Sequence, residues 1–187
     1  MSSRLLLLLV VLLAACSSGD GDDGVEVGFL QDMYDHHDQA VRMALLVLDG
    51  DDTSPITRRF AVDVIASQRY EMGLMVAGLD ARGEERGGPG REVMAWMDMA
   101  MPFADMPGLA TQDDLDALAT ATGVEADEQF LRLMIEHHQG GLHMAEWVAS
   151  HTDDADLRDL ADQIVSSQTM EIGEMELAQD QLGFSRS

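Results

Sequence analysis

The sequence contains no lysine, a single cysteine and few aromatic residues, which make up 5% of the chain. All 11 basic residues are therefore arginines, and they face 35 acidic residues, which gives a net charge of −24 at pH 7. A surface this acidic repels nucleic acid and anionic lipid headgroups, and it favours solubility and cations. An ordinary solvated surface would also account for the charge. Nucleic acid is not an expected partner.

Common catalytic signatures are missing as well. The chain has no serine in a nucleophile-elbow motif, no glycine-rich phosphate loop after a strand and no His-Glu-x-x-His zinc-hydrolase motif. The only cysteine, Cys16, lies near the start, so the rest of the chain has neither a disulfide nor a thiolate ligand. The 187 residues, 46% of them apolar, suffice for one domain with a hydrophobic core.

The first residues predict export and membrane attachment. Arg4 precedes the apolar run Leu5–Leu13, which is too short to span a bilayer as a stable helix. The following "LAAC" resembles a bacterial lipobox, which implies a signal peptide over residues 1–15, cleavage before Cys16 and lipidation of its sulfur. An ordinary secretory signal with a chance cysteine is the alternative. Residues 16–24 are expected to form a flexible acidic tether.

The rest of the chain contains an internal duplication. The segment "FLQDMYDHHDQAVRMA" (residues 29–44) returns as "FLRLMIEHHQGGLHMA" (130–145), and "QRYEMGLM" (68–75) returns as "QTMEIGEM" (168–175). Each segment has helical periodicity, and one helical hairpin cannot bury its apolar stripe alone, whereas two can. We therefore expect an all-α four-helix bundle made from two duplicated hairpins. It would form one domain over residues 25–187, with repeats at about 25–82 and 126–183.

Capping residues predict where the helices begin and end. The first helix should run from Val25 to Leu48, and Thr53 or Ser54 should cap the second. Asp127 and Asp153 are the expected caps of the two helices of the second repeat.

The connection over residues 83–125 is long enough to cross the bundle. It should hold a short helix from about Thr111 and a methionine-rich stretch with Met94, Met97 and Met101 on one helical face. That stretch could be a pliable apolar cap or a holder of Cu(I).

A helical wheel places the histidine pairs beside the core. His36 and His37 flank the buried stripe that passes through Met33, and the second repeat places His137 and His138 in the same way. His143 is expected on the solvent side, and His151 in a loop.

The partner helices carry acidic residues on their buried faces. Glu71 and Glu171 share these faces with Gln68 and Gln168, and a buried carboxylate is costly unless it is paired or binds a metal. A layer of His–Glu hydrogen bonds is one interpretation. Four inward histidines together with two inward glutamates favour the other, a metal site. The candidate ligands are His36, His37, His137, His138, Met33, Met43, Met134, Met144, Glu71, Glu171, Met75 and Met175.

The ligand types indicate which metal is expected. Imidazole with thioether suits copper, particularly Cu(I), whereas imidazole with carboxylate would suit Zn, Fe or Cu(II). The methionines alone are weak evidence, because methionine at helical spacing is commonly core filler. Neither histidine helix has the Glu-x-x-His pair of di-iron bundles, which argues against a ferritin-type iron centre.

Together, the duplicated segments resemble the bacterial family known as domain of unknown function 305. The resemblance implies a ferritin-like helical bundle, often secreted or lipid-anchored, and some members are linked to copper binding and copper tolerance. The family pattern falls on the candidate ligands and on Gln68 and Gln168. One departure is Gly140–Gly141, which should weaken the helix locally.

The sequence therefore predicts an extracytoplasmic lipoprotein, anchored to the membrane through Cys16, that binds or sequesters copper without a need for catalysis. Two alternatives stay open. One is a metal-dependent redox enzyme, and the other is a metal-free envelope protein that contacts a partner.

Overall fold

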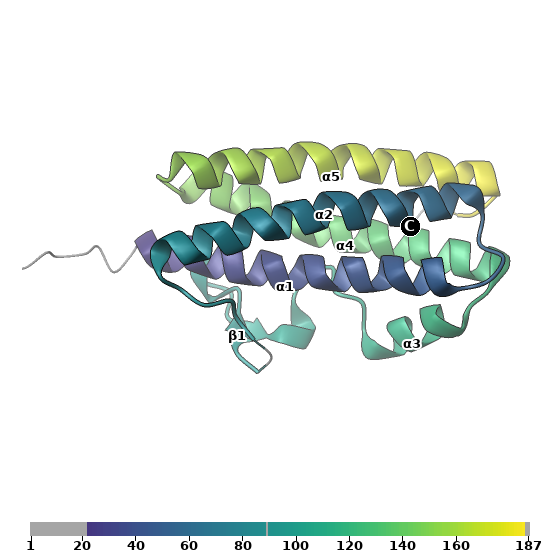
Figure 1. Ribbon diagram of the computed structural model, residues 1–187, viewed down its shortest axis with the longest axis horizontal. Coiled ribbons are helices and arrows are strands. Elements are labelled where there is room, and N and C mark those ends of the chain that lie inside the picture. Colours follow the sequence, from purple (N-terminus) through teal and green to yellow (C-terminus); the bar gives the residue numbers. More distant parts are fainter. Residues whose placement is uncertain (1–21, 89, 186–187) are drawn as a thin grey trace, which may run out of the picture.

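The computed structural model describes residues 22–88 and 90–185, and its secondary structure is almost entirely helical (Figure 1). This confirms the all-α class. The elements in chain order are α1 (Asp22–Asp49), α2 (Pro55–Arg82), β1 (Glu92–Val93), η1 (Ala95–Met97), β2 (Met101–Pro102), η2 (Phe103–Asp105), α3 (Gln112–Thr120), α4 (Gly123–His151) and α5 (Ala155–Leu182).

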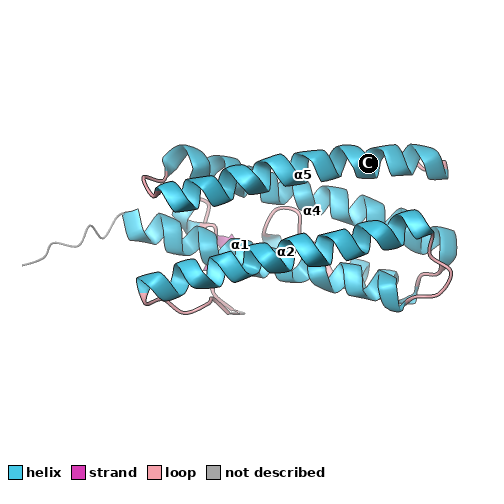
Figure 2. Cartoon of the chain, turned by 45° about the horizontal axis from the view of Figure 1, so that its top comes forward, coloured by secondary structure: helices cyan, strands magenta, loops and turns pink. Residues whose placement is uncertain are grey.

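The four long helices lie side by side as two antiparallel hairpins (Figures 1 and 2). Helix α1 packs along α2, and α4 packs along α5, while the hairpins meet mainly where α1 contacts α4. Helices α1 and α4 run in opposite directions, so Met33 shares one buried cluster with Met144, whereas Met43 shares another with Met134. The duplicated segments therefore face each other about the middle of the bundle.

Local capping explains the bounds of the first hairpin. Ser54 caps α2, as the sequence predicts, by accepting the backbone N–H of Thr57, and Pro55 occupies the first turn. The helix ends at Gly83, whose positive φ of 71° suits glycine. Helix α1 begins at Asp22, three residues before the expected start, so the end of the predicted tether is helical.

Two predicted caps of the second repeat are wrong. Helix α4 begins at Gly123, so Asp127 lies inside it, and its buried carboxylate accepts the backbone N–H of Ser54 at 2.9 Å instead. Asp154 rather than Asp153 caps α5, accepting the backbone N–H groups of Asp156 and Leu157. The carboxylate of Asp127 thus joins the two hairpins.

The crossover connection differs from the expected helical face of methionines. Met94 and Asp98 have positive φ angles of 62° and 57°, which interrupt a helix, and the chain forms a β1–β2 hairpin with short 3₁₀ turns. Met94 and Met97 are nevertheless buried in the core, whereas Met101 is only half-buried. The predicted helix from Thr111 is present as α3, and its capping box pairs Thr111 with Asp114.

A buried aspartate fixes the crossover to α1. Asp32 is fully buried and accepts the backbone N–H of Met94 and the indole N–H of Trp96, and it forms an ion pair with Arg91. Trp96 also packs edge-on against Trp147 of α4. The sequence did not single out Asp32, since its partners are about sixty residues away.

Two further expectations concern the chain ends and His151. His151 is the last residue of α4 rather than a loop residue. Its ring stacks on the ring of Trp147, with the ring centroids 3.9 Å apart. Cys16 and the predicted signal peptide lie outside the described residues. Within the described part of the chain, no helix is long and apolar enough to cross a membrane.

Candidate metal centre

The four predicted core histidines meet in the middle of the bundle. His36 and His37 come from α1, His137 and His138 come from α4, and all four side chains are fully buried. This confirms the placement that the helical wheel predicts, and His143 is exposed, also as predicted.

Two of these histidines are held by glutamates of the neighbouring helix in each hairpin. The Nε2 atom of His37 lies 2.8 Å from a carboxylate oxygen of Glu71, and the Nε2 atom of His138 lies 2.7 Å from Glu171. The two pairs are equivalent in the duplication but differ in exposure, because the side chain of Glu71 is 3% exposed and that of Glu171 is 17% exposed. Each carboxylate therefore orients one imidazole across a hairpin.

The other two histidines contact each other across the interface between the hairpins. The rings of His36 and His137 lie with their centroids 3.7 Å apart, and Nε2 of His137 hydrogen-bonds the backbone carbonyl of His36 at 2.9 Å. Burial lowers the pKa of His36 well below its ordinary value, and the nearby imidazole of His37 acts in the same direction. Burial also lowers the pKa of His137, and the nearby His36 lowers it further. Both rings are thus neutral at neutral pH, which is the form that binds metals.

Several buried donor atoms in this layer have no hydrogen-bond partner. They include Nδ1 of all four histidines, and His36 lacks a partner at Nε2 too. The ring of His36 faces the backbone of Pro107 without a hydrogen bond of normal geometry. Buried polar atoms are normally satisfied, so a set of unpartnered imidazole nitrogens fits a site that receives a ligand.

Methionines flank the histidine layer on both sides. Met33, Met75 and Met144 lie in the buried cluster towards one end of the bundle, and Met43, Met134 and Met175 lie in the cluster towards the other. All six side chains are fully buried. Neutral imidazoles between two groups of thioethers suit Cu(I) better than a hard cation.

The layer is not a finished coordination shell. Across residues 22–88 and 90–185, no group of three or more His, Cys, Asp or Glu side chains is gathered in an arrangement that could hold a metal ion. Gln68 and Gln168, which are also buried, have no hydrogen-bond partner for their amide groups. Metal binding would therefore need the histidine and methionine side chains to move together.

The two glycines of the second histidine helix make room for neighbouring groups. A Cβ atom on Gly140 would collide with the carbonyl oxygen of Pro107, and one on Gly141 would collide with the amide of Gln168. Helix α4 continues without interruption through both residues. The expected local weakness is thus absent from the helix geometry, and tertiary packing explains the glycines.

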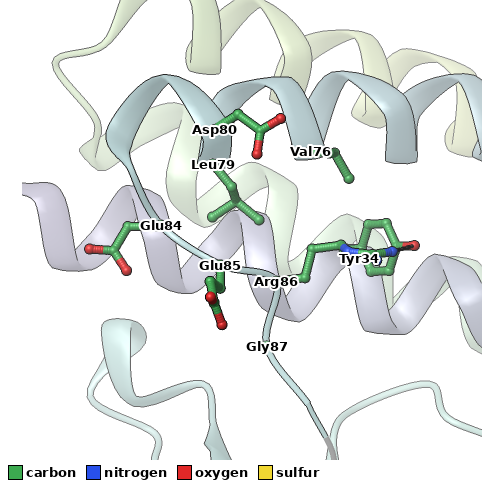
Figure 3. Close-up of a pocket in the computed structure, with 8 residues that line it drawn as sticks. All are labelled: Tyr34, Val76, Leu79, Asp80, Glu84, Glu85, Arg86 and Gly87. Carbon is green, nitrogen blue, oxygen red and sulfur yellow. Dashed lines mark hydrogen bonds between the residues drawn. The ribbon is translucent and has the colours of Figure 1, made fainter.

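A separate pocket lies at the end of α2 (Figure 3). Its lining includes Tyr34, Leu79 and Asp80, and the guanidinium of Arg86 lies over the ring of Tyr34 while donating to its hydroxyl at 2.6 Å. None of the candidate ligands lines this pocket.

Comparison with known proteins shows the family. A sequence profile described as "Domain of unknown function (DUF305)" matches residues 26–178. The chain belongs to this family. Among curated proteins, an uncharacterised protein of Acanthamoeba polyphaga mimivirus is 41% identical over 49 residues, which are 26% of this chain and 32% of that protein. The chain therefore spans about a third of that relative's length.

Several solved structures are similar over most of the chain. A putative secreted DUF305 protein from Streptomyces coelicolor is 34% identical, with 88% of this chain and 98% of that chain covered and a TM-score of 0.80. The protein CopM in its Cu(I)-bound form is 28% identical, with 83% and 96% covered and a TM-score of 0.61. CopM has also been solved with Cu(II) and with Ag.

Proposed function

We propose that this protein binds copper, Cu(I) above all, in the interior of the bundle and thereby buffers or sequesters it. One observation carries the proposal. His37 and His138 each form a hydrogen bond with a glutamate carboxylate through Nε2, while the Nδ1 atom of each ring is buried and has no hydrogen-bond partner. A histidine that binds a metal through one ring nitrogen usually donates the other N–H to a carboxylate or carbonyl, which fixes its tautomer.

The residues divide into two roles under this proposal. The four imidazoles and the buried thioethers would bind the metal, whereas Glu71 and Glu171 would orient His37 and His138 rather than bind it themselves. The likeness to CopM, which binds Cu(I), Cu(II) and Ag, supports copper as the metal. We further infer that the two hairpins and their long crossover form a ferritin-like bundle, since the chain topology fits that class.

The location belongs to the same proposal. A lipid on Cys16 would hold the protein at the outer side of the cell membrane, in keeping with the secreted relative from Streptomyces coelicolor. Cys16→Ser should then release the protein from membranes or block its processing, because the proposed membrane attachment depends on the lipid that Cys16 carries. A variant that fractionates with membranes as the parent does would contradict the lipobox interpretation.

A metal titration tests copper binding. The purified protein is titrated in separate experiments with Cu(I), Cu(II), Zn and Fe(II), and bound metal is counted after removal of the excess. Copper should bind in preference to Zn and Fe(II), and it should raise the temperature of unfolding, since a ligand of the folded state stabilises it. The absence of bound copper would leave the second candidate, a structural His–Glu layer, which the two His–Glu hydrogen bonds favour.

A further inference from the structure

A short part of the crossover closes one side of the histidine layer. We call residues 107–110 the strap. The carbonyl oxygen of Pro107 lies against Gly140 of α4, and Gly108 comes so close that an added Cβ would lie 2.8 Å from the carbonyl oxygen of His137. The ring of His36 lies next to the backbone of Pro107. The strap thus separates the buried imidazoles from solvent.

The two repeats hold the strap in different ways. In the first repeat, Gln39 binds it with both ends of its side-chain amide, donating to the carbonyl of Ala110 at 2.9 Å and accepting its N–H at 2.7 Å. In the second repeat, the equivalent position is Gly140, whose missing side chain makes the space that Pro107 fills. The repeats are therefore equivalent at the histidines but not at this side of the bundle.

A surface pocket opens beside the strap. Strap residues 107–109 form one wall, and Glu136, Gln139, Gly140 and His143 of α4 form the other. The side chains of Glu136, Gln139 and His143 are exposed. His36, which is fully buried and has no hydrogen-bond partner at either ring nitrogen, lies on the inner side of the same strap.

We propose that this pocket is the loading site through which copper reaches the buried histidines, with His143 as its first ligand and the strap as the barrier that it then passes. The proposal rests on the proposed function of copper binding. An exposed imidazole binds a borderline or soft cation without holding it as tightly as a group of buried ligands does.

Loading kinetics separate this pocket from the buried centre. Cu(I) is supplied anaerobically from a weak chelator, and its transfer to the protein is followed by stopped flow. His143→Ala should slow transfer by at least about threefold, because the pocket loses its first ligand and local attraction for the cation. Equilibrium affinity should stay the same, because His143 is not part of the buried centre. His151→Ala removes another exposed histidine of α4, one that does not line this pocket, and should change neither quantity.

A second variant acts on the strap itself. Gln39→Ala removes two hydrogen bonds to Ala110 and should raise both the loading and the release rate by roughly tenfold, the effect of losing bonds of ordinary net strength. Gln163→Ala, an exposed amide on α5, is the matched control.

The outcomes distinguish the two proposals. Unchanged loading by both His143→Ala and Gln39→Ala, in a protein that binds copper, would overturn the loading site and leave the proposed function intact. Equal weakening of equilibrium affinity and loading by His143→Ala would overturn it too, because His143 would then belong to the centre. A parent protein that binds no copper would overturn the proposed function.

Discussion

The rings of His36 and His137 contact each other where the two hairpins meet, with centroids 3.7 Å apart, an angle of 34° between the ring planes and no exposed surface on either residue. They occupy equivalent positions in the two copies of the duplicated segment, so the two copies of the motif contact each other in the core. The contact buries two titratable groups together, and it therefore couples the stability of the fold to their protonation.

The first prediction concerns pH. Burial lowers the pKa of His36 and of His137 below the ordinary value of 6.5, so below that pH the unfolded chain binds more protons than the folded one. The free energy of unfolding of the metal-free protein should therefore fall as the pH drops from 6.5 towards 5, by up to about 1.4 kcal/mol per pH unit for each imidazole. Denaturant unfolding at a series of pH values measures this slope.

The matched variants isolate the buried pair from the many carboxylates. His143→Gln changes an exposed histidine and should keep the parent slope, whereas His36→Gln should reduce it. Equal slopes in all three proteins would show that the buried imidazoles are not the cause.

A second prediction uses the inequality of the two His–Glu pairs. Glu71→Ala should destabilise the metal-free protein by about 1–3 kcal/mol, because it leaves Nε2 of the buried His37 without a partner. Glu171→Ala should cost less, because the side chain of Glu171 is 17% exposed and water can replace it beside His138. Thermal and denaturant unfolding of the two variants give the comparison. A larger loss from Glu171→Ala would contradict the geometry of this layer.

Local periodicity explains why much of the candidate centre could be predicted from the sequence. The buried positions of the four histidines and six methionines follow from helical spacing alone, and so does the exposure of His143. The duplication added the expectation that two such faces meet.

The sequence could not predict contacts that depend on how distant segments dock. The residue type of Asp127 and its position near the predicted helix start are typical of a helix cap. Its carboxylate nevertheless accepts the backbone N–H of Ser54 in the other hairpin. Gly140 looks unfavourable for a helix until Pro107 is seen to occupy the space beside it. The methionine spacing over residues 94–101 matched a helix, but the positive φ angles at Met94 and Asp98 end any such helix.

A third prediction tests the link between the hairpins. Asp127→Ala should lower the free energy of unfolding by about 1–3 kcal/mol, because it removes a buried acceptor from the backbone N–H of Ser54 at the start of α2. Asp153→Ala changes an exposed carboxylate at the start of the other hairpin's second helix and should shift stability by no more than about 0.5 kcal/mol. Equal effects of the two substitutions would mean that the contact with Ser54 contributes nothing to stability.

The last prediction separates a metal centre from a purely structural layer. The double variant His37→Ala with His138→Ala removes the two imidazoles that glutamates orient through Nε2, and it should lower copper affinity by at least about tenfold, or roughly 1.4 kcal/mol. His143→Ala should leave equilibrium affinity nearly unchanged. If the histidines only form hydrogen bonds, the double variant should instead lose about 1–3 kcal/mol of stability per unpaired glutamate, with or without metal. Thermal unfolding of each protein with and without copper measures both effects, since a ligand bound only to the folded state raises its stability. Copper that stabilises the double variant as much as the parent would show that the bound metal lies somewhere other than the layer formed by His37, His138 and their neighbours.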